Sequence, residues 1–131
     1  MRSADQVVLA TNDDWQADAN AAQLQAADLA LLVDEVDGVV VITLRRPEAM
    51  NALHDELTDE ILAVIRRRED DPAVAGFVIT GYGPRAFCAG ADIGRFPALL
   101  GDARASAQYA RDCSRLLVHL DAMRKPVVAA L

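Results

Sequence analysis

Seven residues near the middle of the chain have types and spacing suited to holding a developing negative charge. The run Phe87-Cys88-Ala89-Gly90-Ala91-Asp92-Ile93 has three small residues in succession at its centre. Small side chains leave backbone N–H groups accessible, and such donors can stabilise the charge that develops on a carbonyl oxygen during a reaction. The same composition is also typical of a tight strand-to-helix turn, in which alanine and glycine serve packing alone.

The polar residues in and around this run allow less specific interpretations. Asp92 could act as a general base, but a carboxylate directly after a Gly-Ala turn is expected to cap the next segment. Cys88 is interpreted as a small packed hydrophobe, because no histidine lies near it in sequence to activate its thiol. His54 and His119 fall near the ends of expected helices and are interpreted as surface or capping residues, and residues 66–68 as a solvated basic helix end.

The elements that must position these residues begin with a hairpin. Two β-rich runs, residues 31–36 and 39–44, are separated by Asp37-Gly38, and both turn residues tolerate a positive φ. A helix is then expected over about 55–68, because apolar residues recur at helical spacing between an acidic start and a basic end. An apolar run at 74–80 predicts a buried strand that leads into a glycine-containing loop.

The second half of this region predicts another helix and another strand. A loose segment is expected over about 94–101, followed by a helix from about Ala103 to Met123. One face of that helix is predicted to hold Ala110, Cys113, Leu117 and Leu120. Lys125-Pro126 breaks the helix, and residues 127–131 predict a last buried strand.

The order of these landmarks resembles the N-terminal part of the crotonase, or enoyl-CoA hydratase/isomerase, family. The matched features are Arg46-Pro47 at a strand end, Asn51-Ala52-Leu53, a helix, a strand into a glycine loop, Ala89-Gly90-Ala91-Asp92, and Lys125-Pro126. The resemblance covers about residues 31–131 and implies an α/β, crotonase-like fold built as a repeated β-β-α superhelix, incomplete in this chain. Residues 1–30 are expected to be an N-terminal extension, helical or a linker.

The resemblance also implies a site. The backbone N–H of Ala91 corresponds to one of the two donors of an oxyanion hole for an acyl-CoA thioester. The residues implied to line the ligand or border the coenzyme A path are Ala49, Asn51, Ala52, Leu53, Ala89, Gly90, Asp92 and Ile93. For Arg46, as for Arg45, a contact to a CoA phosphate and a solvated strand end stay equally open.

Composition restricts the possible partners. The 131 residues are 53% hydrophobic and carry a formal net charge of −7, which excludes the basic surface that nucleic acid requires. Cys88 and Cys113 show neither zinc-ligand nor disulfide-framework spacing, and no segment predicts a signal peptide or a membrane span. We therefore expect a cytoplasmic protein without metal or redox cofactor, for which coenzyme A enters as part of the substrate.

In the family, the second oxyanion donor and the acid-base glutamates follow the strand after Lys-Pro, whereas this sequence stops at Leu131. We therefore expect a truncated product or fragment, and whether it is itself an enzyme stays open. The leading hypothesis is hydration of a 2-enoyl-CoA by the complete form, expected to be a homo-oligomer. The alternatives are a non-catalytic module that binds CoA or associates with other subunits, or an inactive fragment.

Overall fold

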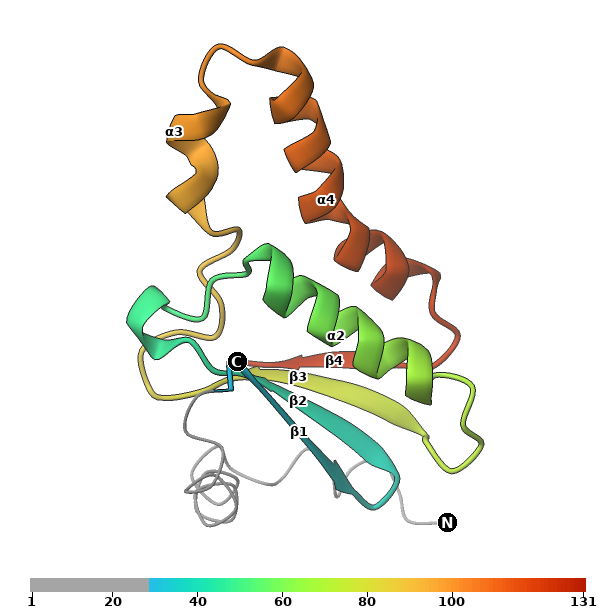
Figure 1. Ribbon diagram of the computed structural model, residues 1–131. Helices are drawn as coiled ribbons and strands as arrows, with labels where there is room; N and C mark the ends of the chain where they lie inside the picture. The colour runs from blue at the N-terminus through green and yellow to red at the C-terminus, as the bar shows by residue number, and fades with distance from the viewer. Residues whose placement is uncertain (1–28) are drawn as a thin grey trace.

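The computed structural model describes residues 29–131, which form a four-stranded sheet with helices over one face (Figure 1). The strands β1 (Leu31–Val36), β2 (Val39–Leu44), β3 (Gly76–Gly81) and β4 (Val127–Ala130) lie side by side in chain order. β1 and β2 pair antiparallel, whereas β2 with β3 and β3 with β4 pair in parallel. The helix expected in the N-terminal extension lies outside the described residues.

The predicted hairpin is confirmed. Val36 is paired with Val39, and the two residues between them, Asp37 and Gly38, have φ values of 49° and 80°. Two successive positive φ values give the turn the twist that antiparallel strands need, and aspartate followed by glycine tolerates them. β2 is thereby held between β1 and β3, and its C-terminal end leads directly into the loop that contributes to the site.

The predicted helices are confirmed with bounds within a residue or two of those expected. α2 (Asp55–Arg68) connects β2 to β3 and lies on the sheet, and α4 (Ala103–Ala122) connects β3 to β4 and packs against α2 (Figure 1). The core lies between α2 and the sheet, and its most buried large side chains are Val40, Ile42, Leu57, Ile61, Ile65 and Phe77. None of the helices within residues 29–131 is long and apolar enough to cross a membrane.

The prediction of a loose segment over 94–101 is wrong in part, because the short helices η3 (Ile93–Arg95) and α3 (Phe96–Leu99) occupy most of it. The Asp92 carboxylate accepts a hydrogen bond from the Gly94 N–H at 2.8 Å and so begins η3. Pro97 falls in the first turn of α3, where a missing N–H costs nothing. A proline that suggested irregular chain therefore occupies a helix start.

The predicted face of α4 also needs correction. Leu116, which the periodicity did not single out, is the buried residue of this helix at 4% exposure, whereas Leu117 is 65% exposed. The inward face runs through Leu116 and Leu120, because α4 contacts α2 with its C-terminal half while its first turns and α3 extend beyond the sheet (Figure 1).

β3 ends at Gly81 because the returning loop passes directly over it. A Cβ at position 81 would lie 2.3 Å from the Phe87 carbonyl oxygen and 2.6 Å from that of Ala86. We expect Gly81→Ala to lower the free energy of unfolding by about 1–3 kcal/mol or more, since backbone would have to move. Chemical unfolding followed by circular dichroism measures this change.

Gly101→Ala is the matched control for Gly81→Ala. Gly101 has φ 81° and nothing within 4 Å of the added Cβ, so the variant incurs only the conformational cost of about 1–2 kcal/mol. A Gly81→Ala variant with wild-type stability would contradict the close approach of the loop.

Candidate functional site

The loop after β3 is joined to the segment before α2 by an isolated parallel β-bridge between Leu53 and Ala91. The Leu53 N–H donates to the Gly90 carbonyl at 2.8 Å, and the Asp92 N–H donates to the Leu53 carbonyl at 2.8 Å. In this pattern the opposed residue, Ala91, directs its own N–H and carbonyl to the other side. No hydrogen bond within residues 29–131 uses the Ala91 N–H, so the donor is available to a ligand.

A cavity of about 1200 Å³ opens beside Ala91, between the loop, the sheet, α2 and α4. Most of its wall is apolar and includes Leu44, Ile61, Ile79, Leu116 and Leu120. The cavity is large enough for a small organic ligand, and an apolar wall with a few polar groups is typical of ligand sites. The Ala91 N–H at the edge of the cavity is therefore placed to donate a hydrogen bond to a polar atom of a mainly apolar ligand.

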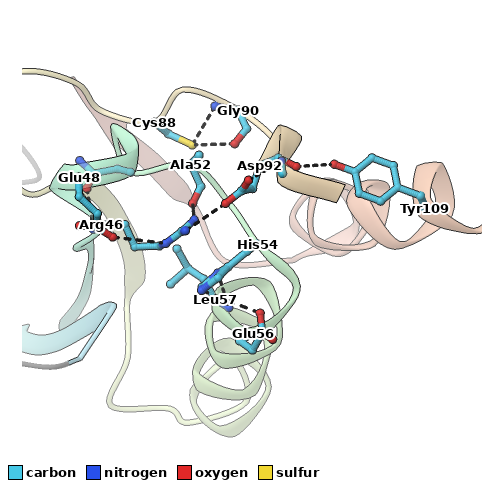
Figure 2. Close-up of polar contacts among 12 residues, drawn as sticks. Arg46, Glu48, Ala52, His54, Glu56, Leu57, Cys88, Gly90, Asp92 and Tyr109 are labelled. Atoms are coloured by element: carbon cyan, nitrogen blue, oxygen red, sulfur yellow. Dashed lines mark hydrogen bonds and ion pairs between the residues drawn. The ribbon is translucent and has the colours of Figure 1, made fainter. Parts of the chain in front are cut away.

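Behind the bridge lies a set of polar contacts centred on Arg46 (Figure 2). Its Nη1 donates to the Ala52 carbonyl at 2.6 Å, and its Nη2 donates to the Asp92 carboxylate at 3.0 Å. The hydrogen bond from the Gly94 N–H, and then the Arg46 guanidinium, hold the pKa of the Asp92 carboxyl below its usual value. Asp92 is thus an ionised cap, as predicted, and its carboxylate is already bonded on both oxygens.

Asn51 connects the two loops from within. Its side chain is 1% exposed, and its backbone has φ 57°, which asparagine tolerates better than most residues. The amide Nδ2 donates to the Tyr82 carbonyl at 3.0 Å and the Ala86 carbonyl at 2.8 Å, while Oδ1 accepts from the Arg46 N–H at 2.9 Å. Asn51 therefore supports the loop that carries Ala91, with both amide hydrogens used inside the chain.

Tyr109 on α4 is a site residue that the sequence analysis missed. Its hydroxyl donates to the Asp92 carbonyl at 2.9 Å (Figure 2), and its ring meets Phe96 edge to face with centroids 5.6 Å apart. The Arg95 guanidinium lies 5.6 Å from the same ring and pairs with Asp55. Aromatic residues make up only 5% of the chain, so Phe96 within the segment 94–101 and Tyr109 shortly after it were the available signal.

Tyr109 gives a pH-dependent prediction. Burial, and then the hydrogen bond with Cys113, raise its pKa from 10.0 to about 12. Because the folded state favours the neutral phenol, its contribution to stability is complete below pH 10 and is lost as the pH rises to about 12. The difference between the tyrosinate absorbance titrations of the wild type and Tyr109→Phe should have its midpoint near pH 12, and a midpoint near 10 would contradict this burial.

The family model described as enoyl-CoA hydratase/isomerase matches residues 34–131. The chain belongs to the enoyl-CoA hydratase/isomerase family. The match includes β2, α2, the bridge and α4, so the loop that carries Ala91 falls within the region that defines membership.

Curated relatives of this family member include hydratases of different acyl-CoA substrates. The chain is 38% identical over 93 residues to an (E)-benzylidenesuccinyl-CoA hydratase from Thauera aromatica, covering 71% of this chain and 35% of the relative. It is 36% identical over 102 residues to a crotonyl-CoA hydratase from Syntrophomonas wolfei, covering 77% and 38%. The chain thus spans about a third of the length of the curated relatives it matches.

Solved structures of family members confirm the fold. An enoyl-CoA hydratase from Rhodobacter sphaeroides matches with a TM-score of 0.66 and 37% identity, covering 77% of this chain and 31% of that one. An enoyl-CoA hydratase/isomerase from Xanthobacter autotrophicus matches with a TM-score of 0.71 and 31% identity, covering 79% and 38%. The predicted crotonase-like α/β fold is therefore confirmed, and residues 29–131 represent part of it.

The residues implied by the family resemblance separate into two groups. Those that line the cavity are Leu53, Gly90, Ala91 and Asp92. Those that do not contribute to its wall are Arg46, Ala49, Asn51, Ala52, Ala89 and Ile93. Ala89 is held in the loop by a 3.0 Å hydrogen bond from its N–H to the Met50 carbonyl, and Ile93 is exposed at the start of η3. Their roles in ligand binding stay predictions.

The remaining candidates are accounted for by local structure. His54 caps α2, with Nδ1 accepting from the Leu57 N–H at 3.2 Å, which confirms the capping interpretation. His119 lies 3.0 Å from the Glu69 carboxylate and joins α4 to the end of α2. Cys88 accepts the Gly90 N–H at its sulfur and lies on the cavity wall. Within residues 29–131, no group of three or more potential ligands could hold a metal ion.

Proposed function

We propose that this chain binds acyl-CoA thioesters and that the Ala91 N–H donates a hydrogen bond to the thioester carbonyl oxygen. The observation that carries the proposal is a backbone donor without a partner in residues 29–131, held by a β-bridge at the edge of a mainly apolar cavity. Family membership and the hydratases among the relatives support the substrate class. In the complete protein, the proposed reaction is hydration of a 2-enoyl-CoA.

The chemistry of such a reaction explains why an N–H donor is needed. When water adds to the β carbon of an enoyl thioester, the electron pair moves to the carbonyl oxygen and forms an enolate. A fixed N–H aimed at that oxygen stabilises the negative charge without reorganising, and one such donor typically contributes on the order of 100- to 1000-fold in rate. Water provides the nucleophile and both hydrogens that are added, so the proposed chemistry needs neither a metal nor a redox cofactor.

Within residues 29–131 no strand pairs with the outer edge of β4, which favours a second candidate function, a module that binds CoA and associates with other subunits. β4 is the last strand in this sheet order, and its residues after Val127 are exposed, so the prediction of a strand at this position is confirmed but its predicted burial is wrong. An exposed strand edge is a template for pairing with another chain. That the complete protein is a homo-oligomer, and that it is cytoplasmic, are further predictions of the proposed function.

Calorimetric titration of the purified chain with crotonyl-CoA and acetoacetyl-CoA tests the proposal, with hydratase activity assayed on the same sample. We expect saturable binding of both thioesters. Turnover would identify the chain as an enzyme by itself, whereas binding without turnover would favour the module. A sample that is folded by circular dichroism and binds neither thioester would contradict the proposed function.

A further inference from the structure

We propose that Arg46 is a positioning residue that holds the Ala91 N–H in place, and that it is not a contact for the phosphates of CoA. The inference rests on the proposed function, because it concerns the donor to the thioester oxygen. It deepens that function by assigning the task of orienting the donor to a side chain far from it in sequence.

The Arg46 guanidinium bonds to residues next to both members of the β-bridge. One of its nitrogens bonds Ala52, the residue before Leu53, and the other bonds Asp92, the residue after Ala91 (Figure 2). Leu53 and Ala91 are the two members of the β-bridge. A single planar group with two parallel donors therefore joins both sides of the bridge, which a flexible single donor could not do.

The bridge needs such support because the chain around it is intrinsically free to rotate. Gly90 has φ 98°, a conformation open to glycine that leaves the Gly90–Ala91 peptide with little steric restraint. That peptide carries the Ala91 N–H on one side and, on the other, the carbonyl that accepts from Leu53. Holding the bridge closed thus fixes the direction of the donor.

The Arg46 guanidinium also offsets the negative charge next to Ala91. The Asp92 carboxylate belongs to the residue next to Ala91, and an uncompensated negative charge there would oppose an oxyanion on a ligand. The Arg46 Nη2 lies 3.0 Å from it, with the arginine side chain 15% exposed, so the pair offsets that charge at short range. The same contacts direct one N–H of each Nη into the chain, and the low exposure of the side chain leaves little of it open to a phosphate.

Amide hydrogen exchange of the full 131-residue chain tests, without any ligand, whether Arg46 holds the Leu53–Ala91 bridge closed. In Arg46→Met we expect the Leu53 and Asp92 amides, which cross the bridge, to lose about ten- to a hundredfold of their protection. The Phe77 amide, bonded to the Pro126 carbonyl at 2.9 Å, serves as an internal reference that should not change. Arg45→Met is the matched control, because it removes an adjacent guanidinium that lies over the Tyr82 ring.

Ligand binding separates positioning from phosphate contact. Butyryl-CoA and the thioether butyl-CoA share every phosphate, but only the thioester has a carbonyl oxygen for the Ala91 N–H. We expect Arg46→Met to weaken the thioester about tenfold or more while leaving thioether affinity unchanged, so that the preference between them is lost. Arg46→Lys keeps the charge but lacks the two-pronged fork, and should restore the preference only in part.

The outcomes distinguish this inference from the proposed function. Equal weakening of both ligands by Arg46→Met, with a stronger salt dependence, would overturn the positioning role in favour of phosphate contact. Unchanged protection of Leu53 and Asp92 would also overturn it, whether or not any ligand binds. A wild type that binds neither ligand would reject the proposed function, while the exchange data alone would still decide whether Arg46 clamps the bridge. If Arg46→Met does not fold, Arg46→Lys gives the same comparison.

Discussion

Asn51→Ala is expected to lower the free energy of unfolding by about 3–5 kcal/mol, because it breaks a buried set of hydrogen bonds. The variant removes both donors to the Tyr82 and Ala86 carbonyls and the acceptor of the Arg46 N–H. These backbone groups would stay partly buried without a side-chain partner, and alanine also tolerates φ 57° less well than asparagine. Urea unfolding followed by circular dichroism measures the loss.

Two further variants separate the causes of that loss. Asn51→Gly keeps the ease of the left-handed backbone but not the hydrogen bonds, so it should remain nearly as destabilised as Asn51→Ala. Met50→Ala is the matched control, since Met50 is the preceding residue, also has positive φ, and has an exposed side chain. Wild-type stability in Asn51→Gly would show that only the conformation of residue 51 matters, against the role given to its amide.

Removal of the Ala91 N–H is expected to weaken acetoacetyl-CoA binding by about ten- to a hundredfold, the worth of a hydrogen bond to a charged or strongly polarised acceptor. Replacing Ala91 by lactic acid exchanges the N–H for an ester oxygen and keeps the methyl group and the chain direction. The position is accessible to synthesis, because a peptide beginning at Cys88 can be ligated to residues 1–87. Calorimetry on the refolded product gives the affinity.

Lactic acid at position 103 provides the matched control for the ester at Ala91. Each ester weakens the preceding carbonyl, which in each case accepts a hydrogen bond: Gly90 from the Leu53 N–H and Asp102 from the Ser106 N–H. Ala103 is the first residue of α4, where the N–H has no intrahelical acceptor, and it does not line the cavity. If the two ester variants bind acetoacetyl-CoA with equal affinity, the Ala91 N–H is not the donor to the thioester oxygen.

The local parts of the fold were predictable because short-range patterns control them. The Asp37-Gly38 turn, the amphipathic α2 and the Pro126 break before β4 each depend on a few neighbouring residues whose conformational preferences agree with the fold. The α3 helix was missed because it depends on a distant contact, the Phe96 ring against Tyr109. Propensity alone marks Gly94 and Pro97 as helix breakers, whereas Gly94 lies within η3 and Pro97 lies in the first turn of α3.

The candidate site likewise combines features that are local in sequence with contacts that only tertiary structure creates. The amino-acid sequence by itself determined that small residues at 89–91 expose the backbone, since glycine and alanine do so at a strand-to-helix turn wherever they occur. The order of the landmarks along the sequence also determined the family. Only the tertiary structure decided that Arg46 reaches Asp92, 46 positions away, and that Asn51 reaches Tyr82 and Ala86. Side-chain partners of this kind are set by how β2 and β3 lie side by side, because parallel strands bring the loops at their C-terminal ends together. No local pattern contains that proximity.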